Sequence, residues 1–324
     1  MKIFAGCAMR NNRAGFYQRS VQIFVLIFAI ITAPLSAQDL LIAEARPGPE
    51  YGGQQNEYLS MPTDVAIGVE GRLYVVDSGH HRIASYDAAG NPLGYFGSEG
   101  KEEGQLQGPV GIATGPDGSV YVADRGNQRL QVFAADGKFL RTLVLLEEGQ
   151  AVTPVGILVA ADGKNLFVTA NNSHRVLSVD RKGKVRSGWG GEGEEPGQFR
   201  YPATLAQDNS GNVLVVDVLN QRIQVFDASG TAMAEIGTLG AKQGSFIRPK
   251  GVAVDGAGRI YVSDSYLGVV QVFTSDGTFA GVLGTNGQAV RFKAPTGLAF
   301  AAGRLYVTDM LAGKVLSYDV EGGR

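Results

Sequence analysis

After residue 40 the chain consists of short apolar runs separated by turns that contain glycine. Between residues 108 and 143 these runs read GIAT, SVYVAD, RLQVFA and FLRTL. Such short runs, rich in Val, Tyr and Phe, predict strands, because a helix would need a longer pattern with a period of 3.6. The turns PDG at 116–118 and ADG at 135–137 carry the glycine that tight hairpins require. The segment is therefore predicted to be a four-stranded antiparallel meander.

This meander recurs along the chain. The expected second strand begins at residues 73, 120, 166, 213, 260 and 305, at intervals of 45 to 47 residues. A proline marks the start of each first strand: Pro62, Pro109, Pro154, Pro202, Pro249 and Pro295. A period in the forties with four strands per unit is the signature of a β-propeller blade. The predicted fold is an all-β, six-bladed β-propeller of four-stranded antiparallel blades.

The propeller is predicted to occupy residues 38–324 as a single domain. Its blades are expected at about 61–107, 108–152, 153–200, 201–247, 248–293 and 294–324. The last blade lacks an outer strand, because the chain stops at SYDVEGGR. An open ring would leave an unpaired strand edge. The unassigned apolar segment DLLIAEA at 39–45 is therefore expected to pair with the last blade and close the ring.

The repeat resembles that of a known family. Its pattern is P-x-G-[IV]-A, then DG-x-[IV]-Y-V-x-D-x-x-x-x-R-[IV]-Q-V-F, with spacers such as EGQLQGP at 103–109, PGQFRYP at 196–202 and QGSFIRP at 243–249. This closely resembles the NHL-repeat family over residues 60–324. The resemblance implies a propeller fold but leaves the function open. NHL-like propellers serve as RNA binders, protein-binding scaffolds and sensor domains and, in the peptide-amidating lyases, as metal enzymes.

The N-terminal region has the order of a secretory signal peptide. Residues 1–20 carry four cations and no acid, residues 21–31 read VQIFVLIFAII, and TAPLSA follows. This predicts a signal peptide at 1–37, cleaved after Ala37, and an exported protein in the periplasm or outside the cell. The alternative is an uncleaved membrane anchor, although the apolar core is shorter than the roughly 18 residues of a spanning helix. Cleavage would remove Cys7, the only cysteine, so the mature chain could form no disulfide.

Export changes the charge balance. The whole chain has 29 Lys and Arg against 31 Asp and Glu, and loss of the four N-terminal cations leaves 25 against 31. Nucleic-acid binding depends on cations that neutralise phosphates. An acidic mature protein is therefore a poor candidate for it.

Two repeated patterns suggest chemistry but are interpreted as structural. The pairs Asp77/Arg82, Asp124/Arg129 and Asp217/Arg222 lie five residues apart, at the two ends of the loop between second and third strands. A carboxylate at this place can accept backbone N–H bonds and pair with the arginine across the hairpin. The histidines are His80, His81 and His174, all in such loops.

No catalytic residues, metal site or cofactor are predicted. The amidating lyases that the repeats resemble use a histidine-based zinc site near the propeller axis, and zinc ligands must converge on one ion. The histidines here are expected away from the axis, and the equivalent positions His81 and His174 lie two blades apart. Lactonase-like propellers use inward carboxylates on a metal, and Asp64 is the only acid at the start of a first strand.

Binding is the remaining function. The long spacers between blades and the loops between second and third strands are expected on one face, at the mouth of the channel. The glycines Gly111, Gly156, Gly251 and Gly297 are expected to keep the mouth open. The candidate binding residues are Asp64, Arg200, Tyr201, Thr204, Arg248, Lys250 and Lys293, with Met61 beside them.

A basic arc on an acidic protein suits an anionic ligand or an acidic partner surface. The chain is therefore predicted to be a monomeric binding or scaffold module for a protein partner or a small anionic ligand. The alternative is a metal-dependent enzyme of the lyase or lactonase type. Trp189 could add an aromatic contact, but burial at the end of a fourth strand is the expected outcome.

Overall fold

The computed structural model describes residues 41–52 and 58–321, and nearly all of their regular structure is β-strand. The helical elements of this part of the chain are four 3-10 turns of three residues each, at Val69–Gly71, Ser78–His80, Arg125–Asn127 and Val218–Asn220. None of its helices is long and apolar enough to cross a membrane. The predicted signal peptide at 1–37 lies outside the described residues.

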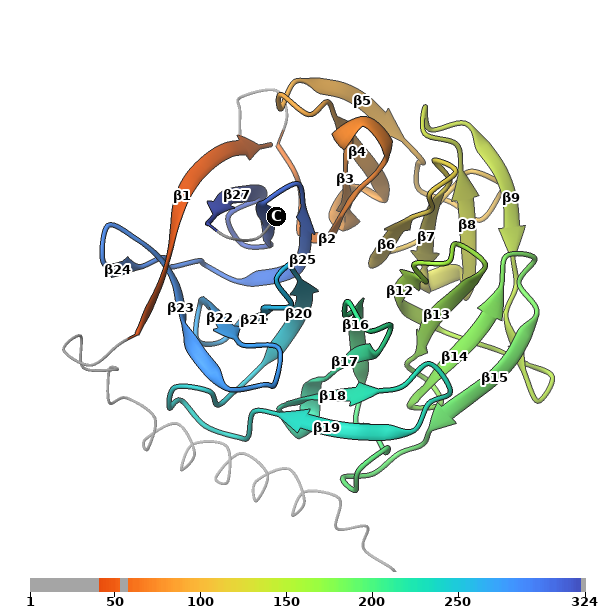
Figure 1. The fold of residues 1–324 in the computed structure, drawn as a ribbon. Coiled ribbons are helices and arrows are strands. Elements are labelled where there is room, and N and C mark those ends of the chain that lie inside the picture. The colour runs from red at the N-terminus through yellow and green to blue at the C-terminus, as the bar shows by residue number, and fades with distance from the viewer. Residues whose placement is uncertain (1–40, 53–57, 322–324) are drawn as a thin grey trace, which may run out of the picture. The chain divides into compact units, whose positions relative to one another are not determined.

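Four separate sheets each contain four consecutive antiparallel strands, which confirms the predicted meander (Figure 1). The first is β2 (Pro62–Ile67), β3 (Leu73–Asp77), β4 (Arg82–Tyr86) and β5 (Pro92–Phe96). The second is β6 (Gly111–Thr114), β7 (Val120–Asp124), β8 (Arg129–Phe133) and β9 (Phe139–Leu143). The third is β12 (Pro154–Val159), β13 (Asn165–Ala170), β14 (Arg175–Asp180) and β15 (Val185–Gly190). The fourth is β16 (Pro202–Gln207), β17 (Val213–Asp217), β18 (Arg222–Phe226) and β19 (Ala232–Ile236).

A fifth sheet has nine strands. Its path runs β20 (Pro249–Val254), β21 (Ile260–Asp264), β22 (Val269–Phe273), β23 (Phe279–Thr285), β1 (Ile42–Tyr51), β27 (Lys314–Val320), β26 (Arg304–Asp309) and β25 (Pro295–Ala301). The short β24 (Gln288–Ala289) pairs with β23. A separate small hairpin is formed by β10 (Leu146–Glu147) and β11 (Gln150–Ala151).

The N-terminal strand β1 joins the two parts of this long sheet. It pairs antiparallel with β27, as predicted, but through Ala45–Tyr51, while Ile42–Glu44 pair in parallel with β23. The prediction that 39–45 forms the strand beside the last blade was therefore wrong in its boundaries. Residues 46–51 resemble a loop because they contain two prolines, and the register shifts between Pro47 and Glu50. Proline is tolerated in an edge strand or at such a bulge.

The first strands of the repeats lie next to one another in chain order. β2 contacts β6, and the series continues through β12, β16, β20 and β25, which contacts β2 again (Figure 1). Hydroxyl groups link these neighbours: Thr63 donates to Val110 O at 2.9 Å, and Thr204 donates to Lys250 O at 2.8 Å. The sheets are thus arranged as in a propeller, with the first strands innermost.

The four glycines that lie two residues after the marker prolines allow this close packing. A Cβ atom on Gly111 would overlap Val155 O, and one on Gly156 would overlap Ala203 O. A Cβ atom on Gly251 would likewise overlap Thr296 O, and one on Gly297 would overlap Asp64. We expected these glycines to keep the channel mouth open. Their role in the structure is instead to let adjacent inner strands approach each other.

Between the innermost and outermost strands the sheets are apolar on both faces. All five residues of β3, β7, β17 and β21 are buried, and the hydrophobic clusters extend from one sheet into the next. A strand covered on both faces needs no polar alternation. This explains why the second strands are nearly continuous apolar runs.

Candidate functional site

The spacers between sheets are held against one face by a repeated aspartate. Asp77, Asp124, Asp217, Asp264 and Asp309 end their second strands and are buried. Each accepts a backbone N–H from the spacer that precedes its own repeat; Asp124, for example, accepts from Gln107 at 2.7 Å. This places the spacers and the loops between second and third strands on the same face, as predicted. We call it the spacer face.

The predicted Asp–Arg pairs are confirmed. The Arg82, Arg129 and Arg222 side chains donate to the aspartates of their own hairpins at 2.7, 2.7 and 3.0 Å. Each arginine thus neutralises a carboxylate that already holds a spacer, so the pairs stabilise the blade and carry no free charge for binding.

Two of the histidines also hold spacers. His81 Nδ1 accepts the backbone N–H of Gly108 at 2.9 Å, and His174 Nδ1 accepts that of Tyr201 at 3.1 Å. Both residues have a positive φ, of 54° and 55°. His80 Nδ1 lies 2.9 Å from Asp77 Oδ2. These contacts confirm that the histidines act as loop residues. Among the described residues, no group of three or more His, Cys, Asp or Glu side chains is placed to hold a metal ion.

Four of the predicted site residues present exposed side chains on the spacer face: Arg200, Tyr201, Arg248 and Lys293. The Arg200 guanidinium is bound to Glu194 at 2.9 Å, and the Tyr201 ring lies edge-on to His174. Within the described part of the chain, Arg248 and Lys293 form no ion pair. Their positive charges are therefore available to a ligand.

Thr204 and Lys250 lie one layer deeper, on the first strands β16 and β20. Thr204 Oγ1 donates to the backbone oxygen of Lys250, which brings the two residues together across two sheets. Burial lowers the pKa of Lys250, and the nearby Arg248 guanidinium lowers it further. Lys250 is therefore a half-buried neighbour of Arg248 rather than an exposed contact.

Asp64 differs from the other six residues because its carboxylate is buried between first strands. It accepts backbone N–H bonds from Val65 at 3.0 Å and from Ile112 of the next sheet at 3.1 Å. Burial raises the pKa of Asp64 to about 7, although both hydrogen bonds oppose the shift. A carboxylate in this place can change its charge near neutral pH, and within residues 41–52 and 58–321 no cation forms an ion pair with it.

A pocket on the spacer face contains residues that the sequence analysis missed. It measures about 460 Å³ and is lined by Leu219 and Leu239 together with Arg200 and Glu194. Leu219 lies in the loop between β17 and β18, and Leu239 lies in the spacer after β19. Comparing equivalent repeat positions for unusual apolar residues would have identified both leucines.

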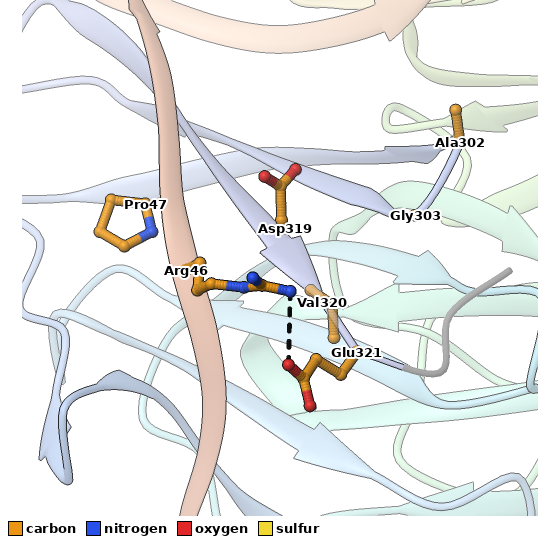
Figure 2. A pocket seen from close by; sticks show the side chains of 7 residues that line it. All are labelled: Arg46, Pro47, Ala302, Gly303, Asp319, Val320 and Glu321. Carbon is orange, nitrogen blue, oxygen red and sulfur yellow. Dashed lines mark hydrogen bonds and ion pairs between the residues drawn. The ribbon is translucent and has the colours of Figure 1, made fainter.

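A larger pocket of about 710 Å³ lies where β25 turns into β26, beside β1 and the end of β27 (Figure 2). It is lined by Arg46, Pro47, Ala302, Gly303, Asp319, Val320 and Glu321. Arg46 and Glu321 form an ion pair across it at 3.3 Å, with both side chains largely exposed. None of the predicted site residues lines this pocket.

The single tryptophan is buried, as expected. Trp189 is 9% exposed and packs against Phe167 and Phe226, with ring centroids 5.7 Å away in both cases. It therefore belongs to the contact between the third and fourth sheets rather than to a binding surface.

Comparison with known proteins places the chain among NHL propellers. The model of the teneurin NHL domain matches residues 96–300, and the NHL-repeat model matches residues 59–86. No curated protein sequence matches.

Several solved structures resemble the chain in fold. A virginiamycin B lyase from Staphylococcus aureus with quinupristin is 16% identical over 87% of each chain, with a TM-score of 0.59. A gluconolactonase from Xanthomonas campestris is 16% identical, covers 86% of this chain and 98% of its own, and has a TM-score of 0.61. A protein of unknown function from Bacteroides thetaiotaomicron is 15% identical, covers 87% and 75%, and has a TM-score of 0.64. At these identities the similarity concerns the fold.

Proposed function

This chain belongs to the teneurin NHL domain family, and from that premise we propose that it is an exported binding or scaffold propeller. Its spacer face receives an acidic protein partner or a small anionic ligand. The proposed site is formed by Arg200, Tyr201, Thr204, Arg248, Lys250 and Lys293, with Asp64 buried behind it. In this proposal the mature domain comprises residues 38–324 and acts as a monomer.

The proposed architecture is a ring of six blades. Four blades are the separate sheets, and the nine-stranded sheet supplies two more, which β1 joins. The cyclic contacts of the six first strands, from β2 round to β25 and back, support this count. In this arrangement β1 is the outer strand of the last blade and ties the two ends of the domain together.

Charge separation on the spacer face is the observation that carries the binding proposal. The loops 218–221, 237–248, 265–268, 286–294 and 310–313 contain four cations and no acid: Lys242, Arg248, Arg291 and Lys293. The other spacers and second-to-third-strand loops that the structure describes in full on this face, at 78–81, 97–110, 125–128, 144–153, 171–174 and 191–201, contain eight acids and three cations. We call the first set the basic half and the second set the acidic half. An unneutralised basic half on an acidic protein favours an anionic group.

Reversing two of these charges is the direct test. The double substitution Arg248→Glu with Lys293→Glu should abolish partner capture from the native exported fraction. It should leave thermal stability nearly unchanged, because exposed charges contribute little to folding. Lys250 is left intact because it is half-buried.

The matched control is Lys138→Glu with Lys184→Glu, two exposed lysines in the turns between third and fourth strands, at the opposite ends of the strands. Equal capture by the wild type and both variants would contradict the proposal. Loss of capture only in the control would mean that the binding site lies on the opposite face, with the turns between third and fourth strands.

The alternative function is a metal-dependent lyase or lactonase, because structures with those activities share the fold. His81 and His174 already accept backbone hydrogen bonds through Nδ1, and the described residues offer no three-ligand cluster. We therefore expect elemental analysis of protein purified without a histidine tag to find no stoichiometric zinc. One zinc per chain that disappears on replacing His81 or His174 would favour the enzyme instead.

A further inference from the structure

Comparing equivalent positions of the repeats shows which exposed side chains the fold needs. Two residues after the end of the second strand, the first three repeats carry Gly79, Gly126 and Asn172. At the same position the last three carry Leu219, Tyr266 and Leu311. Since glycine and asparagine serve the same turn, the large apolar side chains are not required for folding.

The spacers show the same replacement. Leu239 forms an isolated bridge with Phe246, and the equivalent bridges in other spacers pair Glu99 with Leu106 and Glu192 with Phe199. An exposed glutamate is thus the ordinary residue at this place, and Leu239 replaces it. Leu219, Leu239, Tyr266 and Leu311 are 44%, 71%, 48% and 63% exposed. We call these four side chains the apolar set.

All four residues of the apolar set lie in the loops that form the basic half. Leu219 and Leu239 border the pocket of about 460 Å³, in which Arg200 is paired with Glu194 and Arg222 with Glu235. Both acids that line the pocket are therefore ion-paired, and the two leucines give it an apolar wall. Exposed apolar residues that line a pocket together, as Leu219 and Leu239 do, are typical of a protein interaction site when charged residues surround them.

We propose that the basic half binds a polypeptide segment that carries both acidic and apolar side chains, with one apolar side chain inserted between Leu219 and Leu239. This inference rests on the proposed function and specifies its partner. The acids of the segment lie against Arg248 and Lys293, and further apolar residues contact Tyr266 and Leu311. A purely anionic small molecule would leave the apolar set uncovered.

An anionic membrane surface is less compatible with the same face. Cations and apolar side chains together also suit a lipid surface. The acidic half, however, shares the spacer face and would be brought against the lipid headgroups, where its eight glutamates would be repelled. A concave pocket can also enclose a protruding side chain of a polypeptide, whereas a flat bilayer surface would not fill it. The N-terminal segment of this chain is excluded as the occupant because residues 1–37 carry cations and no acid.

A random-peptide display library selected against the protein tests the proposal. The wild type should enrich peptides that combine Asp or Glu with Leu, Ile or Phe. The variant Leu219→Asn with Tyr266→Asn should bind the enriched peptides about tenfold more weakly or worse, because burying a leucine-sized side chain is worth at least that factor. Asparagine is the residue of the third repeat at this position, so the fold should tolerate it.

The matched control is Leu93→Asn with Leu140→Asn. These leucines lie on outer strands and are 49% and 45% exposed, close to the 44% and 48% of Leu219 and Tyr266. The control should bind the enriched peptides as the wild type does. The charge-reversed variant Arg248→Glu with Lys293→Glu should bind them at least as weakly as the apolar variant does.

Each outcome separates the two proposals. If charge reversal abolishes binding and the apolar substitutions do not, the basic half binds anions and the inference about the apolar set is wrong. If neither variant loses binding, both proposals are wrong. Enrichment of basic or neutral peptides, or of none, would overturn the inference. The inference would also be overturned if the wild type floated with vesicles of phosphatidylcholine and phosphatidylglycerol and the substitutions in the apolar set removed that binding. Self-association of the protein that the same substitutions remove would overturn it as well.

Discussion

A chain that starts at residue 52 should unfold at a much lower temperature than one that starts at residue 38. The shorter chain lacks β1, which pairs with β27 and β23. It also lacks Tyr51, which is 1% exposed and packs against Tyr86 and Tyr306 at centroid distances of 5.6 and 5.9 Å. Loss of a buried aromatic ring alone costs about 3–5 kcal/mol, a large part of the roughly 5–15 kcal/mol of a typical domain.

The expected loss has two parts that can be measured separately. Removing residues 38–44 deletes the parallel pairing with β23 and leaves the pairing with β27, whereas removing residues 38–51 also exposes the edge of β27. Thermal unfolding followed by circular dichroism should therefore give three midpoints in descending order. Equal midpoints for the three chains would mean that β1 does not stabilise the ring.

A point substitution provides a control for the truncation. Tyr51→Ala should reproduce much of the destabilisation, whereas Tyr58→Ala should have little effect, since Tyr58 is 62% exposed. Both changes remove the same atoms, so the difference between them measures burial. If the two variants unfold alike, the packing of Tyr51 against its neighbours is not what holds the strand.

Replacing Asp64 with threonine should remove a pH dependence of stability. Because burial raises the pKa of Asp64 to about 7 from an ordinary value of 3.8, the folded state holds the proton more tightly than the unfolded state does. The wild type should therefore lose stability as the pH rises from about 4 to about 7 and remain constant above that. About three pKa units at roughly 1.4 kcal/mol each give a difference of up to about 4 kcal/mol.

Threonine is the natural replacement because Thr204 occupies the same repeat position in β16. Urea unfolding at pH 4 and pH 8 should show that Asp64→Thr gains stability relative to the wild type as the pH rises through this window. The substitution also removes the hydrogen bonds from Val65 and Ile112. The part of that cost that does not depend on pH cancels when the two pH values are compared. A difference that stays constant with pH would show that Asp64 keeps an ordinary pKa.

Asp227 supplies a control of opposite sign. Hydrogen bonds from Ser229 and Thr231 lower the pKa of this exposed carboxylate to about 2. Its contribution to stability is therefore present above pH 4 and is lost as the pH falls toward 2. As the pH rises from about 2 to about 4, Asp227→Asn should become less stable relative to the wild type, the reverse of the change at Asp64.

The strands, the hairpins and the Asp–Arg pairs were predictable because they depend on residues close together in the chain. Asp124 and Arg129 are partners across one hairpin, and their spacing of five residues already implies the contact. The charge of the spacers could also be counted from the sequence. What sequence reasoning overlooked was the apolar set, although the alignment of the repeats contains it.

The sequence alone thus determined the repeating meander, the face on which the spacers lie and the sign of their charge, since hairpin geometry and net charge are local properties. Only the tertiary structure decided the register of β1, the burial of Asp64 and the role of the inner glycines. Each depends on a neighbour from a distant repeat: β27 lies more than 260 residues from β1, and Gly297 packs against Asp64. No local pattern specifies which strand or side chain will occupy that adjacent space.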